Sequence, residues 1–403
     1  MGILSGLRVI DAATYIAGPC AATVLADFGA EVIKIERPPH GDPYRYLSQL
    51  PPMPAAEDLY CWILDNRNKR SLALNLADEA GREVFLRLAA TADVCILNFL
   101  PPLVARFRLS YEELRAVNPR LIYAHVTGYG ELGVDADQPG YDFTAYWARS
   151  GLMDTMYAAG SEPCRSPAGF GDHPTGMSLA AAILLALYHR ERTGQGSKVS
   201  TSLAANGAWS NGCLIQAALC GATPYERQGH RRTINALVNH YQARDGQRFL
   251  LCLIDTQKDW PKLCRALGRP DLVEEERFRT PQLRWANAGL LVDLLDAEFA
   301  GKDLAEWIRL FREHDVLWGR APATEQVAGD PQMLANGVFP RIADSPDREL
   351  RTVTSPVWME GVEKESPRWA PAAGQHTREI LQSLGYDEEA VAQLLARGAA
   401  MAG

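Results

Sequence analysis

Short apolar runs alternate with segments of helical periodicity along the N-terminal part of the chain. Strand-like runs lie at residues 7–11, 32–36, 94–99 and 121–126, with helical patterns at 20–28 and 81–92. A further helix is predicted from Ser110, where S-Y-E-E offers a capping box with Glu113. Strands that alternate with helices in this order pair in parallel through right-handed crossovers. The pattern therefore predicts a doubly wound α/β fold, in which ligands bind beyond the carboxyl ends of the strands.

The sequence pattern changes at about residue 151 and again at about residue 225. A stretch rich in glycine and proline, 151–171, precedes the apolar segment 175–192, which reads TGMSLAAAILLALYHRER and is predicted to be a central core helix. A strand is expected at 198–203. From about residue 225, a turn at Asp245 and Gly246 separates two strand-like runs, and a charged helical block follows. We expect this part to form a second, smaller domain, and a final amphipathic helix near 387–396.

Charge and cysteine content narrow the classes of function. The 41 basic and 49 acidic residues give a net charge of -8, without the positive excess that a run of phosphates requires, so no nucleic acid is expected as a partner. The eight cysteines are widely spaced and form no C-x-x-C pair, which predicts buried thiols in a reducing cytoplasm. No export signal is visible, and the most apolar run, 177–188, is too short to cross a membrane. A cytoplasmic location is therefore the expectation.

Asp172 is the strongest single candidate for chemistry. It lies in G-F-G-D-H-P-T-G-M, directly before the long apolar helix, so its carboxylate is predicted near a helix N-terminus, where free N–H groups favour an anion. Gly169 and Gly171 would let the backbone approach a ligand closely. Two interpretations stay open at this point. The side chain either caps the helix or takes part in catalysis.

Common cofactor motifs are absent, whereas basic residues gather in segments that are predicted to be ligand-facing loops. The histidines show no zinc-ligand spacing, so no metal is predicted, and neither a glycine-rich nucleotide motif nor a G-x-S-x-G elbow is present. The basic residues are Arg37, Arg67, Lys69, Arg70, Arg106 and Arg108. Each is by default a solvated charge, but together they are suited to a phosphorylated cofactor.

Several ordered motifs resemble those of the class III coenzyme A transferases, the family that also contains the α-methylacyl-CoA racemases. The chain opens with GLRVIDAATYIAGPCAATVLADFGAEVIKIERPPHGDPYR. N-K-R-S, N-F, G-Y-D, G-D-H-P-T-G-M and Y-H-R-E-R-T-G-Q-G follow at 68–71, 98–99, 140–142, 171–177 and 188–196. The resemblance covers essentially the whole chain.

This resemblance implies a Rossmann-like large domain with a parallel sheet, built from 1–224 and 326–403, with a smaller α+β domain, 225–325, inserted between them. It implies an interlocked homodimer. It also implies that Asp172 is the nucleophile, with Tyr141, Asp142 and Gly171 as active-site neighbours. The positions that match the family's coenzyme A contacts are Ala17, Arg37, Lys69, Arg70, Asn98, Phe99 and Arg106. An acyl-CoA donor and a carboxylic acid acceptor are then the substrates, and no tightly bound cofactor is expected.

Two alternatives to transfer of coenzyme A are open. The racemases resemble G-H-D where this chain has Gly140, Tyr141 and Asp142, and they use that histidine as an acid or base at the α-carbon. A phenol with an ordinary pKa of about 10 is a poor base at neutral pH, so Tyr141 favours the transferase. A racemase would need His125 or His173 to replace the missing base. The second alternative is a coenzyme A-binding protein without activity. The presence of Asp172 with both neighbouring glycines argues against it.

Overall fold

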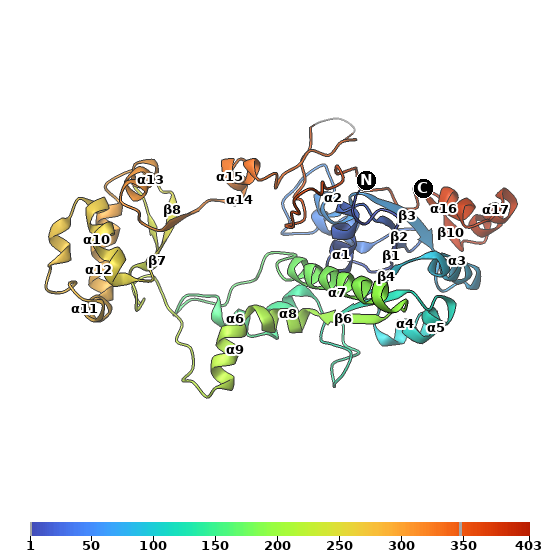
Figure 1. The fold of residues 1–403 in the computed structure, drawn as a ribbon, viewed down its shortest axis with the longest axis horizontal. Coiled ribbons are helices and arrows are strands. Elements are labelled where there is room, and N and C mark those ends of the chain that lie inside the picture. Colours follow the sequence, from blue (N-terminus) through green and yellow to red (C-terminus); the bar gives the residue numbers. More distant parts are fainter. Residues whose placement is uncertain (1, 346–348) are drawn as a thin grey trace. The chain divides into compact units, whose positions relative to one another are not determined.

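The computed structural model describes residues 2–345 and 349–403, which form two compact units (Figure 1). The larger unit comprises Met1–Asp154, Arg165–Ala222 and Asn336–Gly403, and the smaller unit comprises Thr155–Cys164 and Thr223–Ala335. The chain thus leaves the larger unit and returns to it. Thr155–Cys164 joins the smaller unit, although nothing in its sequence pattern indicated this. The predicted boundaries at 224 and 325 stay an interpretation of the sequence.

The larger unit is built on a seven-stranded sheet with the order β10-β3-β2-β1-β4-β5-β6. Its strands are β1 (Arg8–Asp11), β2 (Glu31–Glu36), β3 (Lys69–Leu74), β4 (Val94–Leu97), β5 (Ile122–Thr127), β6 (Lys198–Ser202) and β10 (Ala400–Met401). All the pairs are parallel except that β10 runs antiparallel to β3. The order 3-2-1-4-5-6 is that of the Rossmann fold. The predicted fold class is therefore confirmed.

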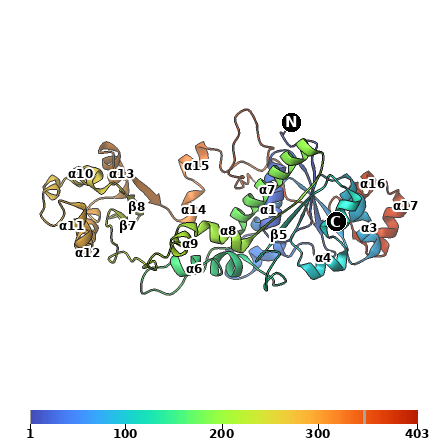
Figure 2. The same cartoon turned by 60° about the horizontal axis from the view of Figure 1, so that its bottom comes forward.

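Helices cover both faces of this sheet (Figure 2). The helices of this unit are α1 (Ala17–Asp27), α2 (Tyr60–Asn66), α3 (Glu79–Thr91), α4 (Pro101–Phe107), α5 (Tyr111–Val117), α6 (Leu152–Thr155), α7 (Asp172–Thr193), α8 (Leu203–Ser210), α9 (Gly212–Leu219), α16 (Thr377–Ser383) and α17 (Glu388–Ala396), with the short η1 (Pro43–Gln49) and η2 (Asp142–Ala148). One core packs α1 and α7 against the sheet, and the other packs α3, α5, α16 and α17 against the opposite face. The predicted capping box at Ser110 and Glu113 is present at the start of α5.

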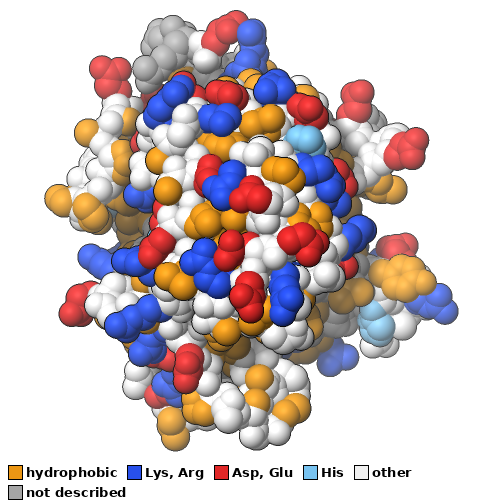
Figure 3. Space-filling view, turned by 90° about the vertical axis from the view of Figure 1, so that its left-hand side faces the viewer, with side chains coloured by type: hydrophobic (Ala, Val, Ile, Leu, Met, Phe, Trp, Pro, Cys, Tyr) orange, Lys and Arg blue, Asp and Glu red, His pale blue; other side chains and the backbone are white. Residues whose placement is uncertain are grey.

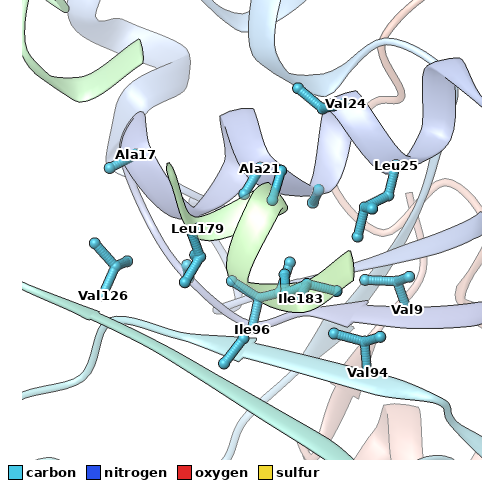
Figure 4. Close-up of a cluster of buried hydrophobic side chains, with 14 of the residues drawn as sticks. Val9, Ala17, Ala21, Val24, Leu25, Val94, Ile96, Val126, Leu179 and Ile183 are labelled. Atoms are coloured by element: carbon cyan, nitrogen blue, oxygen red, sulfur yellow. The ribbon is translucent and has the colours of Figure 1, made fainter. Parts of the chain in front are cut away.

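Alternating strand residues supply the two cores because successive side chains of a strand point to opposite faces. Val9 and Val94 face α1 and α7, where they meet Leu25 and Ile183 (Figure 4). Their neighbour Ile10 belongs to the other core. This alternation on buried β1 leaves Asp11, at its carboxyl end, on the same face as α1.

Helices α1 and α7 pack closely at their N-terminal ends. A Cβ atom on Gly176 would stand 2.8 Å from the Ala17 carbonyl oxygen and 2.9 Å from the Cys20 Sγ. Only glycine permits this distance, which is far below an ordinary van der Waals contact. The crossing brings the start of α7, with Asp172, beside the first turn of α1.

Helix α7 is not the fully enclosed core helix that its apolar pattern predicts. One face is buried, but Leu184, Leu185 and Tyr188 are 45%, 71% and 63% exposed. A helix that is apolar all round is covered on every side. Within a single chain, nothing described covers the outer face of α7, so the prediction of a core helix is wrong for that face.

The segment that contains Lys69 and Arg70 is strand β3, not the predicted ligand-facing loop. Its residues pair in parallel with β2, and β10 pairs with its other edge. The apolar positions Leu72 and Leu74 belong to the core, and the basic residues that precede them hid this strand pattern. Two predicted coenzyme A contacts, Lys69 and Arg70, therefore lie in the sheet.

The smaller unit combines a three-stranded antiparallel sheet with helices. The strands are β7 (Val238–Gln242), β8 (Arg248–Cys252) and β9 (Trp318–Ala321), and the predicted turn at Gly246 joins the first two. The helical elements are α10 (Thr256–Leu267), η3 (Pro270–Val273), α11 (Pro281–Ala286), α12 (Ala288–Phe299), α13 (Leu304–Glu313), α14 (Thr324–Val327) and α15 (Pro331–Ala335). Its core is rich in aromatic residues, including Phe249, Phe299 and Trp307.

The surface corrects one prediction and agrees with another. Only half of the cysteines are buried; Cys164, Cys213, Cys220 and Cys252 are exposed, and all eight are free thiols. On the face that Figure 3 shows, basic and acidic side chains are interspersed with apolar ones and do not gather by sign. Among the described residues, no helix has both the length and the apolar character needed to cross a membrane.

Candidate active site

The candidate site lies at the carboxyl ends of β1 and β4, where the strand order reverses. The loop after β1 is tied to the loop after β4 because Thr14 donates its N–H to the Asn98 Oδ1 (3.0 Å) and accepts from the Asn98 Nδ2 at its carbonyl (2.9 Å). The next N–H, that of Tyr15, donates to Asp42 Oδ1 (3.2 Å). This switch point is the usual ligand crevice of a doubly wound sheet.

A buried ion network supports these loops from below. Lys34, 0% exposed, places its ammonium 2.9 Å from Asp42 Oδ2 and 3.7 Å from Asp11 Oδ2. Burial lowers the pKa of Lys34, but the charges of Asp11 and Asp42 outweigh that effect and raise it. A buried ammonium is tolerated only with such partners. Asp42 in turn accepts from the N–H of Tyr15, so the sheet fixes the conformation of the loop after β1.

Helix α1 begins with uncapped backbone donors. Its N-cap residue, Ile16, provides no side-chain hydrogen bond. Among the described residues, the N–H groups of Ala17 and Gly18 have no hydrogen-bond acceptor. Such groups, together with the helix dipole, favour a negative charge at this position. Ala17, predicted to contact coenzyme A, is therefore at the switch point.

Asp172 is the first residue of α7, and its side chain does not cap the helix. The N-cap residue is Gly171, with no side-chain cap hydrogen bond. Instead, the N–H of Gly171 donates to both carboxylate oxygens of Asp142, in η2, at 3.1 and 3.0 Å. Of the two interpretations of Asp172, the helix cap is therefore wrong. Its carboxylate, partly exposed, accepts no hydrogen bond within the described chain.

The surroundings of Asp172 disfavour its charge. Burial and the negative charge of Asp142 raise the pKa of Asp172 to about 7, although the cation of His173 opposes them. Burial also raises the pKa of Asp142, against the N–H groups that donate to it. Two carboxyl groups close together cannot both ionise easily. A carboxyl group that titrates near neutral pH, beside a ligand crevice, is typical of an active site.

Position 171, directly before Asp172, has room only for glycine. A Cβ atom at this position would lie 2.1 Å from Cγ of Tyr146 and 2.7 Å from Oδ1 of Asp142. Gly169 has φ +79°, a left-handed conformation that favours glycine. The predicted neighbours Asp142 and Gly171 are thus directly joined to Asp172 in the structure.

The sequence did not identify Asp65 as a site residue, and it offered His173 only as a replacement base for racemisation. His173 has its Nε2 3.2 Å from Asp65 Oδ1 and its Nδ1 2.9 Å from the Gly169 carbonyl oxygen. Asp65 lies in α2, more than a hundred residues away, where its sequence context carries no signal. His173 follows Asp172 directly, and that adjacency was the available signal.

The Cys20 Sγ, an Asp65 oxygen and a His173 ring nitrogen lie within 4.8 Å of one another, close enough to hold a metal ion. Both ring nitrogens and both Asp65 oxygens already take part in hydrogen bonds. Burial raises the pKa of the Cys20 thiol, which opposes the thiolate that metals bind. We interpret this group as a hydrogen-bonded cluster. The prediction that the protein binds no metal is untested.

Aromatic side chains flank Asp142 and Gly171 in the chain, since Tyr141 and Phe170 directly precede them. Tyr141 is 52% exposed and packs edge-on against Tyr15, with ring centroids 5.6 Å apart. Phe170, 43% exposed, packs edge-on against Trp147 at 5.7 Å. Burial, with the nearby Tyr141, raises the pKa of Tyr15. The exposed parts of these rings offer apolar surface.

The predicted coenzyme A contacts separate into two groups. Asn98 and Phe99 follow β4 directly, Arg37 follows β2, and Arg106 lies in α4 with its charge exposed. Arg37 and Arg106 form no ion pair among the described residues. The Asn98 amide is committed to Thr14, and the Phe99 ring packs edge-on against Phe107 at 5.6 Å. All four lie at the carboxyl ends of strands or in the helix that follows.

Lys69 and Arg70 form the second group, whose cations are already paired within the chain. The buried Lys69 ammonium donates to Asp11 Oδ2 and to three other oxygens, at 2.7 to 3.1 Å. Arg70 pairs with Glu31, at the amino end of β2, and with Glu379. The structure does not bring these two cations together with Arg37 and Arg106, so their role in coenzyme A binding remains untested.

Comparison with known proteins connects this geometry to a family. The model of CoA-transferase family III matches residues 4–377. A (R)-2-hydroxy-4-methylpentanoate CoA-transferase of Clostridioides difficile is 34% identical over 96% of this chain and 97% of its own length. A cinnamoyl-CoA:phenyllactate CoA-transferase of Clostridium sporogenes is 34% identical over 97% and 96%. The crystal structure of a CAIB/BAIF family protein from Brucella suis has a TM-score of 0.84 and 30% identity, covering 95% of this chain and 99% of that one. The chain belongs to CoA-transferase family III, as the resemblance of its motifs predicted.

Proposed function

We propose that this CoA-transferase moves coenzyme A from an acyl-CoA thioester to a carboxylic acid through covalent intermediates on Asp172. The observation that carries the proposal is the state of this side chain: it is partly exposed at the start of α7, accepts no hydrogen bond within the described residues and has a pKa of about 7. A carboxylate that is poorly solvated is a better nucleophile than one in water.

The steps conserve the free energy of the thioester. A carboxylate oxygen of Asp172 attacks the thioester carbonyl carbon, the C–S bond breaks, and coenzyme A leaves as the thiolate from a mixed anhydride. The thiolate then attacks the Asp172 carbonyl, which releases the donor acid and leaves an aspartyl thioester. The acceptor carboxylate attacks that thioester to give a second anhydride, and the returning thiolate attacks its acyl carbonyl and regenerates Asp172. No water is consumed, so the site must exclude it.

The groups at the switch point are suited to coenzyme A. The free N–H groups at Ala17 and Gly18 favour the oxyanion that forms when the thioester is attacked. Arg37 and Arg106 have exposed cationic groups for phosphate oxygens. We assign Asn98 the task of fixing Thr14, and Phe99 that of an apolar contact. The aromatic rings of Tyr15, Tyr141 and Phe170 then face the acyl group.

Racemisation is the second candidate and is disfavoured by Tyr141. Removal of an α-proton needs a base near Asp172, and this chain has an exposed phenol, Tyr141, where the motif of the racemases has a histidine. His173 does not supply this base, because its ring nitrogens point to Gly169 and Asp65. The relatives described above carry names of CoA-transferases. A protein that binds coenzyme A without turnover is the remaining alternative.

We also propose a homodimer, in which a second copy covers the apolar surface of α7 to α9. Leu185 and Tyr188 of α7, Trp209 of α8 and Leu219 of α9 are 71%, 63%, 87% and 76% exposed. Apolar side chains exposed together on neighbouring helices are typical of protein interfaces. An interlocked arrangement of the two chains is part of this proposal.

The decisive experiment is to trap the intermediate. The protein is incubated with a panel of acyl-CoA esters, succinyl-CoA among them, and then with hydroxylamine, and the peptide that contains Asp172 is examined by mass spectrometry. We expect a hydroxamate at Asp172 with some of the donors and none in Asp172→Ala. Deuterium uptake at the α-carbon of a branched acyl-CoA without a hydroxamate would instead indicate the racemase. Binding without either signal would indicate the inactive protein.

A further inference from the structure

His173 and Asp65 form a pair beside Asp172 that the mechanism above does not use. The His173 ring nitrogens lie 3.2 Å from Asp65 Oδ1 and 2.9 Å from the Gly169 carbonyl oxygen. A carboxylate and a carbonyl oxygen only accept hydrogen bonds, so both nitrogens fit these contacts as donors. The ring with two N–H groups is the imidazolium. A cation therefore stands at the residue next to the proposed nucleophile.

Asp65 is held in place by a second hydrogen bond. It is 2% exposed, and its second oxygen, Oδ2, accepts from the Tyr44 hydroxyl at 2.6 Å. Tyr44 is itself 2% exposed and packs with Ile16 and Trp62. A buried carboxylate requires such partners. The result is a chain of contacts from Tyr44 through Asp65 to His173.

We propose that Asp65, oriented by Tyr44, is a positioning residue that keeps His173 doubly protonated and thereby favours the carboxylate form of Asp172. The inference rests on the proposed function, because it assigns Asp172 as the nucleophile. Asp65 touches no reacting atom. Its effect reaches the reaction through the charge of His173, which opposes the two influences that keep Asp172 neutral, namely burial and Asp142.

The charges around His173 fix the sign of this effect. Burial lowers the pKa of His173, but the hydrogen bond and the charge of Asp65 outweigh it and raise the value to about 9. His173 lowers the pKa of Asp172 by more than the charge of Asp65 raises it. The other titratable or charged groups around this cluster are Cys20 of α1, Tyr44 of η1, Asp142 of η2, Lys69 of β3 and Arg67.

Two substitutions separate this role from a structural one. In His173→Gln the cation is lost while Asp65 remains, so the pKa of Asp172 should rise by about one unit or more. In Asp65→Asn the ring loses its proton at neutral pH, but the anion of Asp65 is lost as well. The acid limb of the reaction should therefore move to higher pH in both variants, and further in His173→Gln than in Asp65→Asn.

The test has one readout of protonation and one of chemistry. With ¹⁵N-histidine labelling, NMR of the intact protein follows the His173 ring from pH 5 to 10, assigned by its loss in His173→Gln. We expect wild-type His173 to titrate well above the ordinary 6.5 and Asp65→Asn to bring its pKa down to about 6.5 or below, because burial then acts without the opposing anion. His376, elsewhere in the large unit, is the internal control. The rate of Asp172 hydroxamate formation against pH gives the acid limb.

Tyr44→Phe provides a second variant in case Asp65→Asn does not fold. It keeps the ring and removes the hydrogen bond to Asp65, and a smaller shift in the same direction is expected. Tyr241→Phe, which removes a buried hydroxyl bonded to the Ala236 carbonyl in the smaller unit, should change neither readout. An unchanged His173 titration, or an acid limb that moves to lower pH in Asp65→Asn, overturns the inference. Absence of any wild-type hydroxamate overturns the proposed function instead, and that result is visible before any variant is made.

Discussion

At the scale of single residues, the raised pKa of Asp172 lowers the stability of the folded protein as the pH rises. The pKa of Asp172, about 7 in the folded protein, exceeds the ordinary value of about 3.9. The folded state therefore binds more protons than the unfolded chain between these two pH values, and the contribution of Asp172 to stability falls as the pH rises through this window. Asp172→Asn should accordingly be more resistant to urea than wild type at pH 8, with the difference vanishing below about pH 4. Urea unfolding at both pH values tests this, and an equal difference at both would contradict the assignment of the charge.

Gly171 should tolerate no side chain. In Gly171→Ala, the added Cβ would meet the Tyr146 ring at 2.1 Å, so either the start of α7 or η2 must move. We expect a loss of about 1–3 kcal/mol in the free energy of unfolding, as for other overpacked sites, together with loss of the hydroxamate at Asp172. Gly212→Ala is the matched control, since a Cβ there meets nothing within 4 Å. Similar unfolding curves for the two variants would show that the contact is not restrictive.

At the scale of elements, the connection between the loops after β1 and β4 is the part that should decide coenzyme A affinity. Asn98→Ala removes both hydrogen bonds to Thr14 and frees the residues that lead into α1. We expect a rise in the KM for acyl-CoA of about tenfold, since two hydrogen bonds are worth about 1–3 kcal/mol, with a smaller change in kcat. Steady-state kinetics tests this. Asn118→Ala, which loses three side-chain hydrogen bonds, to the carbonyl oxygens of Ala89 and Ala92 and from the N–H of Arg120, should leave the KM unchanged.

The elements also show how far the sequence pattern reaches. Apolar runs located β1, β2, β4 and β5, and a capping signal located α5, because local periodicity and turn chemistry decide those elements. The strand β3 was missed, since its first residues are Lys69 and Arg70, whose partners lie on β1, β2 and α16. Asp172 was found through its glycines. Asp65 was not, because its contact with His173 is created only when α2 packs against the start of α7.

At the scale of the whole molecule, the outer face of α7 is the feature that a single chain leaves unexplained. Its apolar pattern predicts cover on every side, and the structure of one chain covers one side only. We expect wild type to sediment as a dimer, and Leu185→Glu, which puts a charge on that face, to lose the dimer at a lower urea concentration than wild type. Leu290→Glu, at a position 52% exposed on α12 of the smaller unit, is the control and should lose the dimer at the same urea concentration as wild type.

An interlocked pair differs from a simple pair in how it comes apart. Two chains that pass through each other cannot separate while both are folded, whereas two subunits joined only by a surface dissociate on dilution. If the dimer is interlocked, loss of the dimer in urea should coincide with loss of tertiary structure at every protein concentration, and dilution alone should release no folded monomer. Sedimentation velocity and intrinsic tryptophan fluorescence, measured on the same urea series at two concentrations about a hundredfold apart, follow the two events. Folded monomers at low concentration would contradict interlocking. The dimer would then form only through the apolar face of α7, without any threading of the chains.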